Sequence, residues 1–562
     1  MRHKPGADGE LADQASEAIL GANPFVGIDA GQVVGDVARS VARRLRPRIL
    51  AHAAARTAAE LGEVLAGRSQ LRPADGDRRF ADVAWTDNPG YQRLMQGYLA
   101  LTAAGHRLVD ESGLSDVETQ RAHFAVTLLA DALAPTNGLL SNPAAIKRAF
   151  DTGGGSLVRG ARNLVRDLRD NGGMPATVDR RAFEVGRTVA TSPGAVVHRN
   201  PVFELIQYRP TTDAVLERPL LVVPPQINKF YVLDIAPGRS FTEYAVAQGI
   251  PFFAISWRNP SAAQREWGLD VYVQACLDAI EVASEICGAD AVNVLGLCAG
   301  GVTMAMLLGH LAAAGSLNKV CSATFAVAML DLKAPSLAGA LASDALIATA
   351  LRRSRAKGVL EGSEMARVFA WMRPNDLVWN YWVNNYLLGN DPPAFDILFW
   401  NADHTRLPAA LHADFLDLYA RNPLLTAGEA RVLGQGIDLK QVTCPTYVLA
   451  GVTDHIVPWR AAYRTTQVLG GRPEFVLSSS GHIQSIVNPP GSHKASYLSG
   501  GGPCGDPDAW LKTASERKGS WWDHWTQWVT MLSGERRPAP RSLGSRKHRA
   551  QKKAPGKYVL EH

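Results

Sequence analysis

The sequence lacks several features that would place it in a membrane or outside the cell. It has no uninterrupted apolar run of the roughly eighteen residues that a membrane-spanning helix needs. Residues 1–8 carry charges and offer no apolar stretch for a secretory signal. Only six cysteines occur among 562 residues, and their irregular spacing does not indicate a disulfide framework. We therefore expect a cytoplasmic chain without a membrane span, whose thiols stay reduced.

The net charge of +6 is distributed unevenly along the chain. Much of the basic excess lies between residues 535 and 557, where prolines and glycines are interspersed with arginines and lysines. This composition predicts a flexible tail over residues 535–562. A basic tail can contact an anionic surface or nucleic acid, but this one lacks the interleaved aromatic residues of a single-strand binder. We expect no nucleic-acid partner and favour a solubilising role.

A chain of 562 residues is too long for one ordinary hydrophobic core, so we expect two domains with appendages. Residues 1–20 are predicted to be disordered. Residues 21–195, rich in alanine, leucine and arginine at helical spacing, predict a helical N-terminal domain. From 196 to 534, apolar runs alternate with helical patterns, which indicates an α/β domain with a parallel sheet. Within it, residues 331–439 lack strand-like runs and are expected to form an inserted cap.

The most informative motif is Gly-Leu-Cys-Ala-Gly at residues 296–300, which follows a short apolar run and leads into a helical one. A G-x-nucleophile-x-G sequence is typical of the strand-to-helix turn that carries the nucleophile in the α/β-hydrolase fold, here with Cys298 where serine is usual. Glycines are needed because this turn is sharp and strained. The cysteines that lie in apolar stretches are expected to be buried hydrophobic residues. They are Cys276, Cys287, Cys321 and Cys444.

The acid and the base of such a site follow the nucleophile in chain order. Asp454 comes shortly after the predicted strand 446–450, at a carboxyl end where catalytic groups of parallel sheets collect. His482 lies in a Ser/Gly-rich loop after the next predicted strand, 474–477. His455 competes for the role of base, but it adjoins the proposed acid and its side chain is expected to point elsewhere. Each residue alone has a structural explanation, yet three strand-end positions in the right order favour a Cys298–His482–Asp454 triad.

Two backbone N–H groups are candidates for the oxyanion hole: that of Ala299, directly after the nucleophile, and that of Ile227, in the loop after an early strand. Aromatic residues gather inside the expected cap, among them Trp379, Tyr381 and Trp382. Such density is typical of a core, but it equally fits an acyl channel or a dimer contact. As a channel lining it would exclude water from the site. No metal and no cofactor are expected.

Five motifs resemble the polyhydroxyalkanoate synthases: NPFVG at 23–27, FADVAW at 80–85, PPQINKFY at 224–231, SWRNP at 256–260 and GHIQS at 481–485. The resemblance implies an acyltransferase that polymerises (R)-3-hydroxyacyl-CoA into a storage polyester and releases CoA. It also implies a cytoplasmic homodimer that contacts the polymer granule surface and granule-associated proteins.

Three further stretches bear on the type of synthase. Residues 225–228, 264–268 and 371–390 resemble the single-subunit medium-chain type (class II) more than the short-chain type (class I). Ala299, directly after the cysteine, departs from the usual family pattern. The resemblance therefore favours medium-chain substrates, while this position leaves the acyl length open.

The resemblance also suggests a mechanism. His482 is expected to deprotonate Cys298, which then attacks the thioester. Asp454 is implied to assist when a 3-hydroxyl group attacks, either as a direct base or by orienting His482. We expect Asp454→Asn to slow elongation more than the first acylation, whereas equal slowing would indicate a purely orienting role. An acyl-CoA thioesterase or polyester depolymerase on the same fold is the alternative function, and a non-catalytic granule-coat protein is a third.

Overall fold

The computed structural model describes residues 35, 39, 43–44, 46–334, 344–502 and 505–562. The predicted disordered segment 1–20, the motif at 23–27 and Cys504 lie outside the described residues. The chain forms two compact units. Of the described residues, those before Arg180 and Arg367–Ala394 belong to the first unit, and Arg180–Ala366 and Phe395–His562 form the second.

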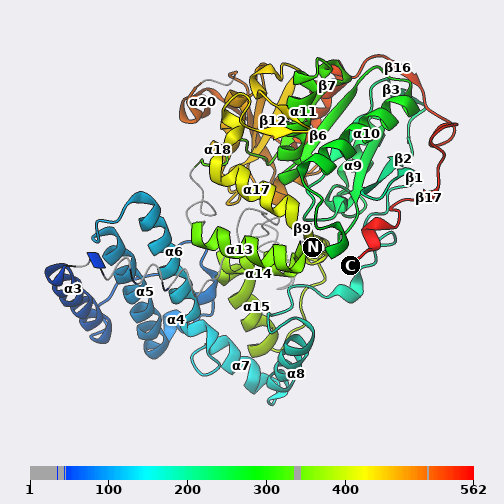
Figure 1. The fold of residues 1–562 in the computed structure, drawn as a ribbon. Coiled ribbons are helices and arrows are strands. Elements are labelled where there is room, and N and C mark those ends of the chain that lie inside the picture. Colours follow the sequence, from blue (N-terminus) through cyan, green and yellow to red (C-terminus); the bar gives the residue numbers. More distant parts are fainter. Residues whose placement is uncertain (1–34, 36–38, 40–42, 45, 335–343, 503–504) are drawn as a thin grey trace. The chain divides into compact units, whose positions relative to one another are not determined.

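The first unit is helical, as the sequence predicts for this region. Its main helices are α3 (Pro47–Leu65), α5 (Pro89–Asp110), α6 (Asp116–Ala132), α7 (Pro143–Asp151) and α8 (Gly155–Asp170) (Figure 1). The short helix α4 (Ala84–Asp87) precedes α5, and Asn88 caps α5 by accepting hydrogen bonds from the N–H groups of Gly90 and Tyr91. The later segment Arg367–Ala394 adds the helical turns η7 (Asn375–Trp379), α15 (Asn380–Trp382) and η8 (Val383–Leu387).

The second unit is built on a sheet of eleven strands in the order β15-β14-β13-β12-β7-β6-β4-β5-β2-β1-β17. The six central strands pair in parallel throughout. They are β4 (Leu220–Val223), β5 (Phe252–Trp257), β6 (Val292–Leu297), β7 (Val320–Ala326), β12 (Thr446–Gly451) and β13 (Glu474–Ser478). Their side chains are almost wholly buried, as expected for a parallel sheet covered on both faces. The predicted α/β architecture, with strands at 446–450 and 474–477, is confirmed.

Antiparallel strands extend the sheet at both edges. On one side these are β2 (Phe203–Tyr208) and β1 (Gly194–Arg199), and on the other β14 (Ser496–Ser499) and β15 (Ser515–Lys518). Helices α9 (Phe241–Ala247), α10 (Leu269–Cys287), α11 (Ala299–Ala313), α18 (Trp459–Val468) and α21 (Trp521–Leu532) pack around the parallel strands (Figure 1). Among the described residues, no helix combines the length and apolarity needed to cross a membrane.

The chain between β7 and β12 adds no strand to the main sheet within its described residues. It contains four main helices: α13 (Asp344–Lys357), α14 (Gly362–Met372), α16 (Asp396–Ala402) and α17 (Ala409–Arg421). It also contains two short strand pairs. β8 (Val359–Leu360) pairs with β9 (Leu407–Pro408), and β10 (Arg431–Val432) pairs with β11 (Gln435–Gly436). The expected cap 331–439 is, however, divided between the two units. Its middle part joins the first unit through contacts such as the bond from Trp382 Nε1 to the carbonyl of Asn137, which no local pattern predicts.

The prediction of a flexible tail over residues 535–562 is wrong. β16 (Arg536–Pro538) pairs with β3 (Ala214–Leu216), β17 (Lys552–Lys553) pairs with β1, and η11 (Tyr558–Leu560) follows. The buried carboxylate of Glu204 accepts hydrogen bonds from the N–H groups of Lys557 and Tyr558 at 2.7 and 3.0 Å. Composition reports the charge of the side chains, which largely face solvent here. It does not report that the backbone pairs with the edges of existing strands.

Candidate active site

Cys298 lies on the sharp turn between β6 and α11. Its backbone has φ 49° and ψ −120°, a strained conformation for a residue with a side chain. The flanking glycines permit the turn: a Cβ atom on Gly300 would lie 2.3 Å from the carbonyl oxygen of Val223, and one on Gly296 would lie 2.8 Å from the Cα of Gly301. The turn leaves Cys298 partly exposed at the carboxyl end of the sheet. The predicted elbow geometry is therefore confirmed.

Asp454 and His482 follow the neighbouring parallel strands β12 and β13, so their strand ends lie side by side. The Nδ1 atom of His482 donates a hydrogen bond to Oδ2 of Asp454 at 2.7 Å. The other carboxylate oxygen, Oδ1, accepts from the N–H groups of Ile456 and Val457, both at 2.9 Å. Only 1% of the His482 side chain and 0% of the Asp454 side chain are exposed. This arrangement fixes the imidazole ring and leaves its Nε2 atom for another partner.

That other partner is Cys298, which forms a hydrogen bond with His482. Burial alone lowers the pKa of His482, but the negative charges of Asp454 and Cys298, and the hydrogen bonds to both, outweigh it and raise this pKa to about 10. His482 therefore retains a proton readily when the sulfur atom is a thiolate. The competing histidine, His455, has an exposed side chain. The structure thus brings together the three residues that the sequence singled out.

Burial disfavours ionisation of the other described cysteines. Burial raises the pKa of Cys444 to about 11 and that of Cys287 to about 12, and it raises that of Cys276 further. Cys276 and Cys444 are buried as expected, whereas Cys287 and Cys321 are partly exposed. Within the part of the chain that the structure describes, no group of three or more His, Cys, Asp or Glu residues is arranged to hold a metal ion.

The two candidate oxyanion donors lie on adjoining segments. Ala299 is the first residue of α11, so its N–H has no acceptor within the helix. Ile227 lies in the loop after β4, the strand that pairs directly with β6. This loop is held by three hydrogen bonds: Gln226 Nε2 donates to Thr303 Oγ1, Thr405 Oγ1 donates to the carbonyl of Gln226, and the Thr405 N–H donates to the carbonyl of Ile227. The loop is thus fixed beside the elbow.

A buried ion pair that sequence reasoning missed supports the same loop. Lys229 Nζ lies 2.7 Å from Asp403 Oδ1, and the two side chains are 3% and 8% exposed. Lys229 also donates to the carbonyl of Val559 at 2.6 Å, and the hydroxyl of Tyr231 donates to Asp403 Oδ2 at 2.8 Å. The available signal was the single lysine within the otherwise uncharged motif PPQINKFY.

We expect Asp403→Asn to destabilise the second unit by about 3–5 kcal/mol, because it leaves the Lys229 ammonium buried without a counter-charge. The free energy of unfolding in denaturant measures this effect. The matched control is Asp508→Asn, which breaks a surface pair with Arg460 whose side chains are both 54% exposed. That change should alter the free energy of unfolding far less, because solvent screens an exposed pair. Equal effects of the two substitutions would contradict the importance of the buried pair.

A cysteine on a strained strand-to-helix turn, followed by a histidine–carboxylate pair at later strand ends of the same parallel sheet, is typical of the α/β-hydrolase fold. Accordingly, residues 227–489 match the family model described as "alpha/beta hydrolase fold", and residues 76–245 match that described as "Poly-beta-hydroxybutyrate polymerase (PhaC) N-terminus".

Comparison with curated proteins defines the family. The chain is 50% identical to poly(3-hydroxyalkanoate) polymerase 1 of Ectopseudomonas oleovorans, over 98% of this chain and 99% of that protein. It is 50% identical to polymerase 2 of the same organism, over 96% of each chain. It is 41% identical to the polymerase subunit PhaC of Cupriavidus necator, over 88% of this chain and 84% of that protein. The chain belongs to the poly(3-hydroxyalkanoate) polymerase family, and the predicted resemblance is confirmed.

Proposed function

We propose that this chain polymerises (R)-3-hydroxyacyl-CoA into polyhydroxyalkanoate through an acyl intermediate on Cys298, with release of CoA. The observation that carries the proposal is the hydrogen-bonded series Cys298–His482–Asp454 on the elbow. It occurs in a chain that is 50% identical, over 98% of its length, to a poly(3-hydroxyalkanoate) polymerase.

In the first step, His482 accepts the proton of the Cys298 thiol, and the thiolate attacks the carbonyl carbon of the incoming thioester. The bond from Cys298 Sγ to carbon forms, the bond from carbon to the sulfur of CoA breaks, and the departing thiolate takes the proton from His482. The developing oxyanion is stabilised by the N–H groups of Ala299 and Ile227.

In the second step, the 3-hydroxyl group of the next unit attacks the acyl group on Cys298. His482 takes the hydroxyl proton, a carbon–oxygen ester bond forms, and Cys298 leaves as a thiolate. The lengthened chain now ends in a CoA thioester and can acylate Cys298 again. The substrate brings CoA with it, so no separate cofactor is needed.

The choice of cysteine follows from the energetics of acyl transfer. Exchange of one thioester for another keeps the high transfer potential of acyl-CoA on the enzyme. Transfer from cysteine to an alcohol then forms an oxoester, which is downhill and drives chain growth. A serine would lose this driving force at the first step, because its ester is no more reactive than the product.

We assign Asp454 the orienting role. Its side chain is 0% exposed, Oδ1 already accepts two backbone N–H groups, and Oδ2 accepts from His482. A direct base would need an oxygen atom that a substrate hydroxyl can approach. The structure therefore favours equal slowing of both steps in Asp454→Asn over the selective slowing of elongation expected from the sequence.

The proposal extends to the cellular context implied by the family resemblance. We infer a cytoplasmic homodimer at the polymer granule surface, in contact with granule-associated proteins. We also propose medium-chain (class II) substrates, because the type-specific motifs agree with the higher identity to the two Ectopseudomonas oleovorans polymerases than to the Cupriavidus necator subunit.

The alternative, a thioesterase or depolymerase, differs in what accompanies CoA release. Purified chain should be supplied in parallel with 3-hydroxybutyryl-CoA and 3-hydroxydecanoyl-CoA, and CoA, free 3-hydroxy acid and polymer quantified. We expect one ester bond per CoA released and a preference for the longer substrate. Stoichiometric free acid without polymer would establish the hydrolase instead.

The raised pKa of His482 predicts a pH dependence of stability. Its pKa is about 10 in the folded chain against an ordinary value of 6.5, so the folded state binds the proton more tightly than the unfolded state. This contribution to the free energy of unfolding is complete below about pH 6.5 and is lost as the pH rises through 10. We expect the stability difference between the native chain and His482→Gln to shrink over that range in chemical denaturation. A difference that is constant or grows with pH would contradict the prediction, and His493→Gln, at an exposed histidine, is the control.

A further inference from the structure

Within the first unit, helix α8 packs against η8 through a face of polar and small residues. We call Ser156, Gly160, Asn163 and Asp167 its packing sector; all four are buried. A Cβ atom on Gly160 would lie 1.9 Å from the carbonyl oxygen of Tyr386, so the helix approaches the backbone of η8 closely. Asn163 donates to the carbonyls of Asn385 and Asn390, and Asp167 accepts from the hydroxyl of Tyr386 at 2.8 Å. The buried face is thus held by hydrogen bonds.

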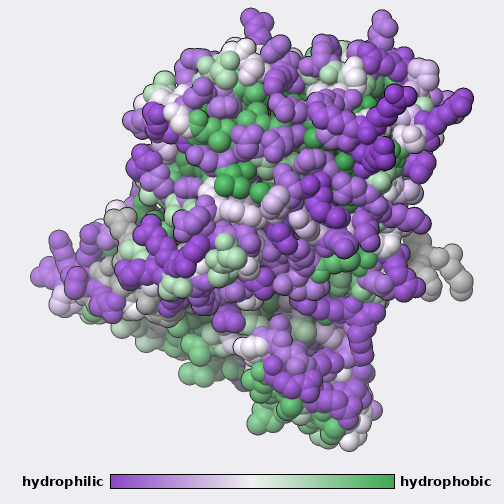
Figure 2. Space-filling view, turned by 45° about the vertical axis from the view of Figure 1, so that its right-hand side comes forward, coloured by the Kyte–Doolittle hydropathy of each residue, from purple (hydrophilic) through white to green (hydrophobic). Residues whose placement is uncertain are grey.

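Part of the outward face of α8 is apolar, although the usual arrangement of a surface helix turns its apolar side inward. Val158, Val165 and Leu168 are 62%, 66% and 61% exposed. Their spacing of seven and three residues places them on one side of the helix. We call these three residues the apolar sector. The neighbouring Phe150, at the end of α7, is 82% exposed. In Figure 2, hydrophobic residues gather at the lower end of the molecule, where Figure 1 places α7 and α8.

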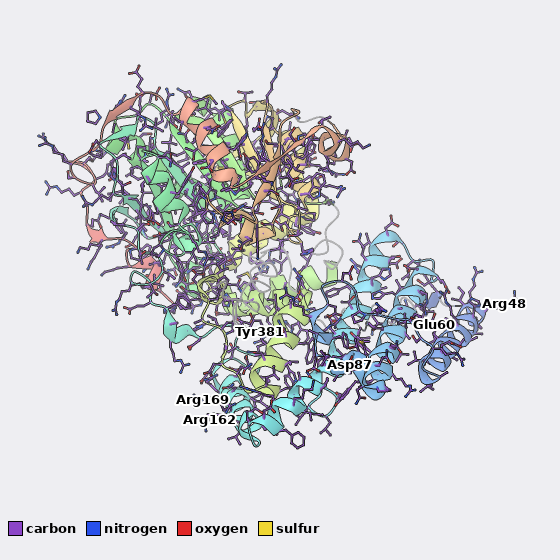
Figure 3. All side chains as sticks on the ribbon, turned by 180° about the vertical axis from the view of Figure 1, so that it is seen from behind. Arg48, Glu60, Asp87, Arg162, Arg169 and Tyr381 are labelled. Carbon is purple, nitrogen blue, oxygen red and sulfur yellow. The ribbon has the colours of Figure 1, made fainter. Side chains whose placement is uncertain are left out.

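Arginines lie on the side of α8 between the apolar sector and the packing sector. Arg159, Arg162, Arg166 and Arg169 recur at intervals of three or four residues and form the arginine sector. Arg159 Nε donates to the carbonyl of Gly389, and Arg166 donates to Asn163 Oδ1. Arg162 and Arg169 are exposed, and Figure 3 labels both on the outside of α8. Among the described residues, Arg169 pairs with the exposed Asp170, a contact that an anion readily replaces.

We propose that α8 is an interfacial helix that docks on an anionic phospholipid surface. An apolar strip beside a row of arginines is the pattern by which helices lie in the plane of such a surface, with the apolar side chains among acyl chains and the guanidinium groups at headgroup phosphates. Charge complementarity selects this occupant. Two copies of α8 facing each other would bring their arginines together, and the repeating unit of a polyester carries no negative charge. The proposal does not depend on the catalytic chemistry.

The test is sedimentation of the full chain with vesicles. Equimolar phosphatidylglycerol and phosphatidylcholine should bind the chain at least about tenfold more tightly than pure phosphatidylcholine, and added salt should weaken binding. The triple change Val158→Ser, Val165→Ser and Leu168→Ser removes the apolar sector, and Arg162→Gln with Arg169→Gln removes its exposed charges. Each variant should lose about tenfold or more in affinity.

The matched control is Leu65→Ser, Leu101→Ser and Leu129→Ser, which changes leucines of the same unit that are 75%, 56% and 50% exposed. This variant should bind as the native chain does, and circular dichroism should show that all variants retain their helices. The proposal is overturned if the native chain ignores anionic vesicles or binds neutral ones equally. It also fails if the α8 variants bind normally, or if the chain binds polyester particles but not vesicles.

Discussion

Replacing Cys298 by serine is expected to lower the rate of polymer formation by about a thousandfold or more while the fold stays intact. Serine fits the elbow, because the strained turn and its two glycines depend on the backbone and not on the sulfur atom. Polymerisation is nevertheless lost, because a hydroxyl group is far harder to ionise than a thiol. In addition, an ester of serine with the acyl chain lacks the driving force of a thioester.

The measurement is polymer mass and CoA release from 3-hydroxydecanoyl-CoA, with circular dichroism to confirm folding. Cys444→Ser is the matched control, because Cys444 is 9% exposed and lies outside the site. It should retain most of the activity. Turnover of Cys298→Ser at the native rate would refute both the nucleophile and the argument from thioester energetics.

Asp454→Asn is expected to slow the first acylation and elongation equally, each by about 10²–10⁴-fold. An amide at this position accepts through only one atom, so it cannot serve both the two backbone N–H groups at Oδ1 and the imidazole N–H at Oδ2. The ring of His482 then loses its orientation and the charge that raises its pKa. Both steps use His482 for proton transfer, so the rates of both should fall to the same extent.

Rapid-quench measurement of the first equivalent of CoA, compared with steady-state elongation, separates the two steps. Asp508→Asn, at an exposed aspartate, should affect neither step. A variant that acylates normally but elongates slowly would show that Asp454 itself deprotonates the 3-hydroxyl group, in agreement with the expectation from sequence and against the orienting role.

The parts of the structure that follow from local patterns were predictable. Apolar runs bounded by turn residues located β12 and β13, and glycines on both sides of Cys298 identified the elbow. The order of nucleophile, acid and base then brought Cys298, Asp454 and His482 together, since parallel strands place their carboxyl ends along one edge. Their catalytic roles stay predictions until the variants are measured.

The parts that depend on contacts between distant residues were not predictable. The basic segment after residue 535 is ordered because its backbone pairs with β1 and β3, more than three hundred positions earlier in the sequence. The expected cap is divided because Asn385 and Tyr386 bind α8, which precedes them by more than two hundred positions. Lys229 likewise finds Asp403 only after folding. Such pairs cannot be predicted from composition or from the periodicity of apolar residues.

The central claim is that the growing acyl chain is attached to the sulfur atom of Cys298. Native chain mixed with 3-hydroxydecanoyl-CoA, quenched in acid within the first turnover, digested and analysed by mass spectrometry tests it directly. The peptide that contains Cys298 should gain the mass of one 3-hydroxydecanoyl group, in a bond that hydroxylamine cleaves, in step with release of one CoA. Release of CoA with Cys298 unmodified, or with the acyl group on another residue, would contradict the mechanism.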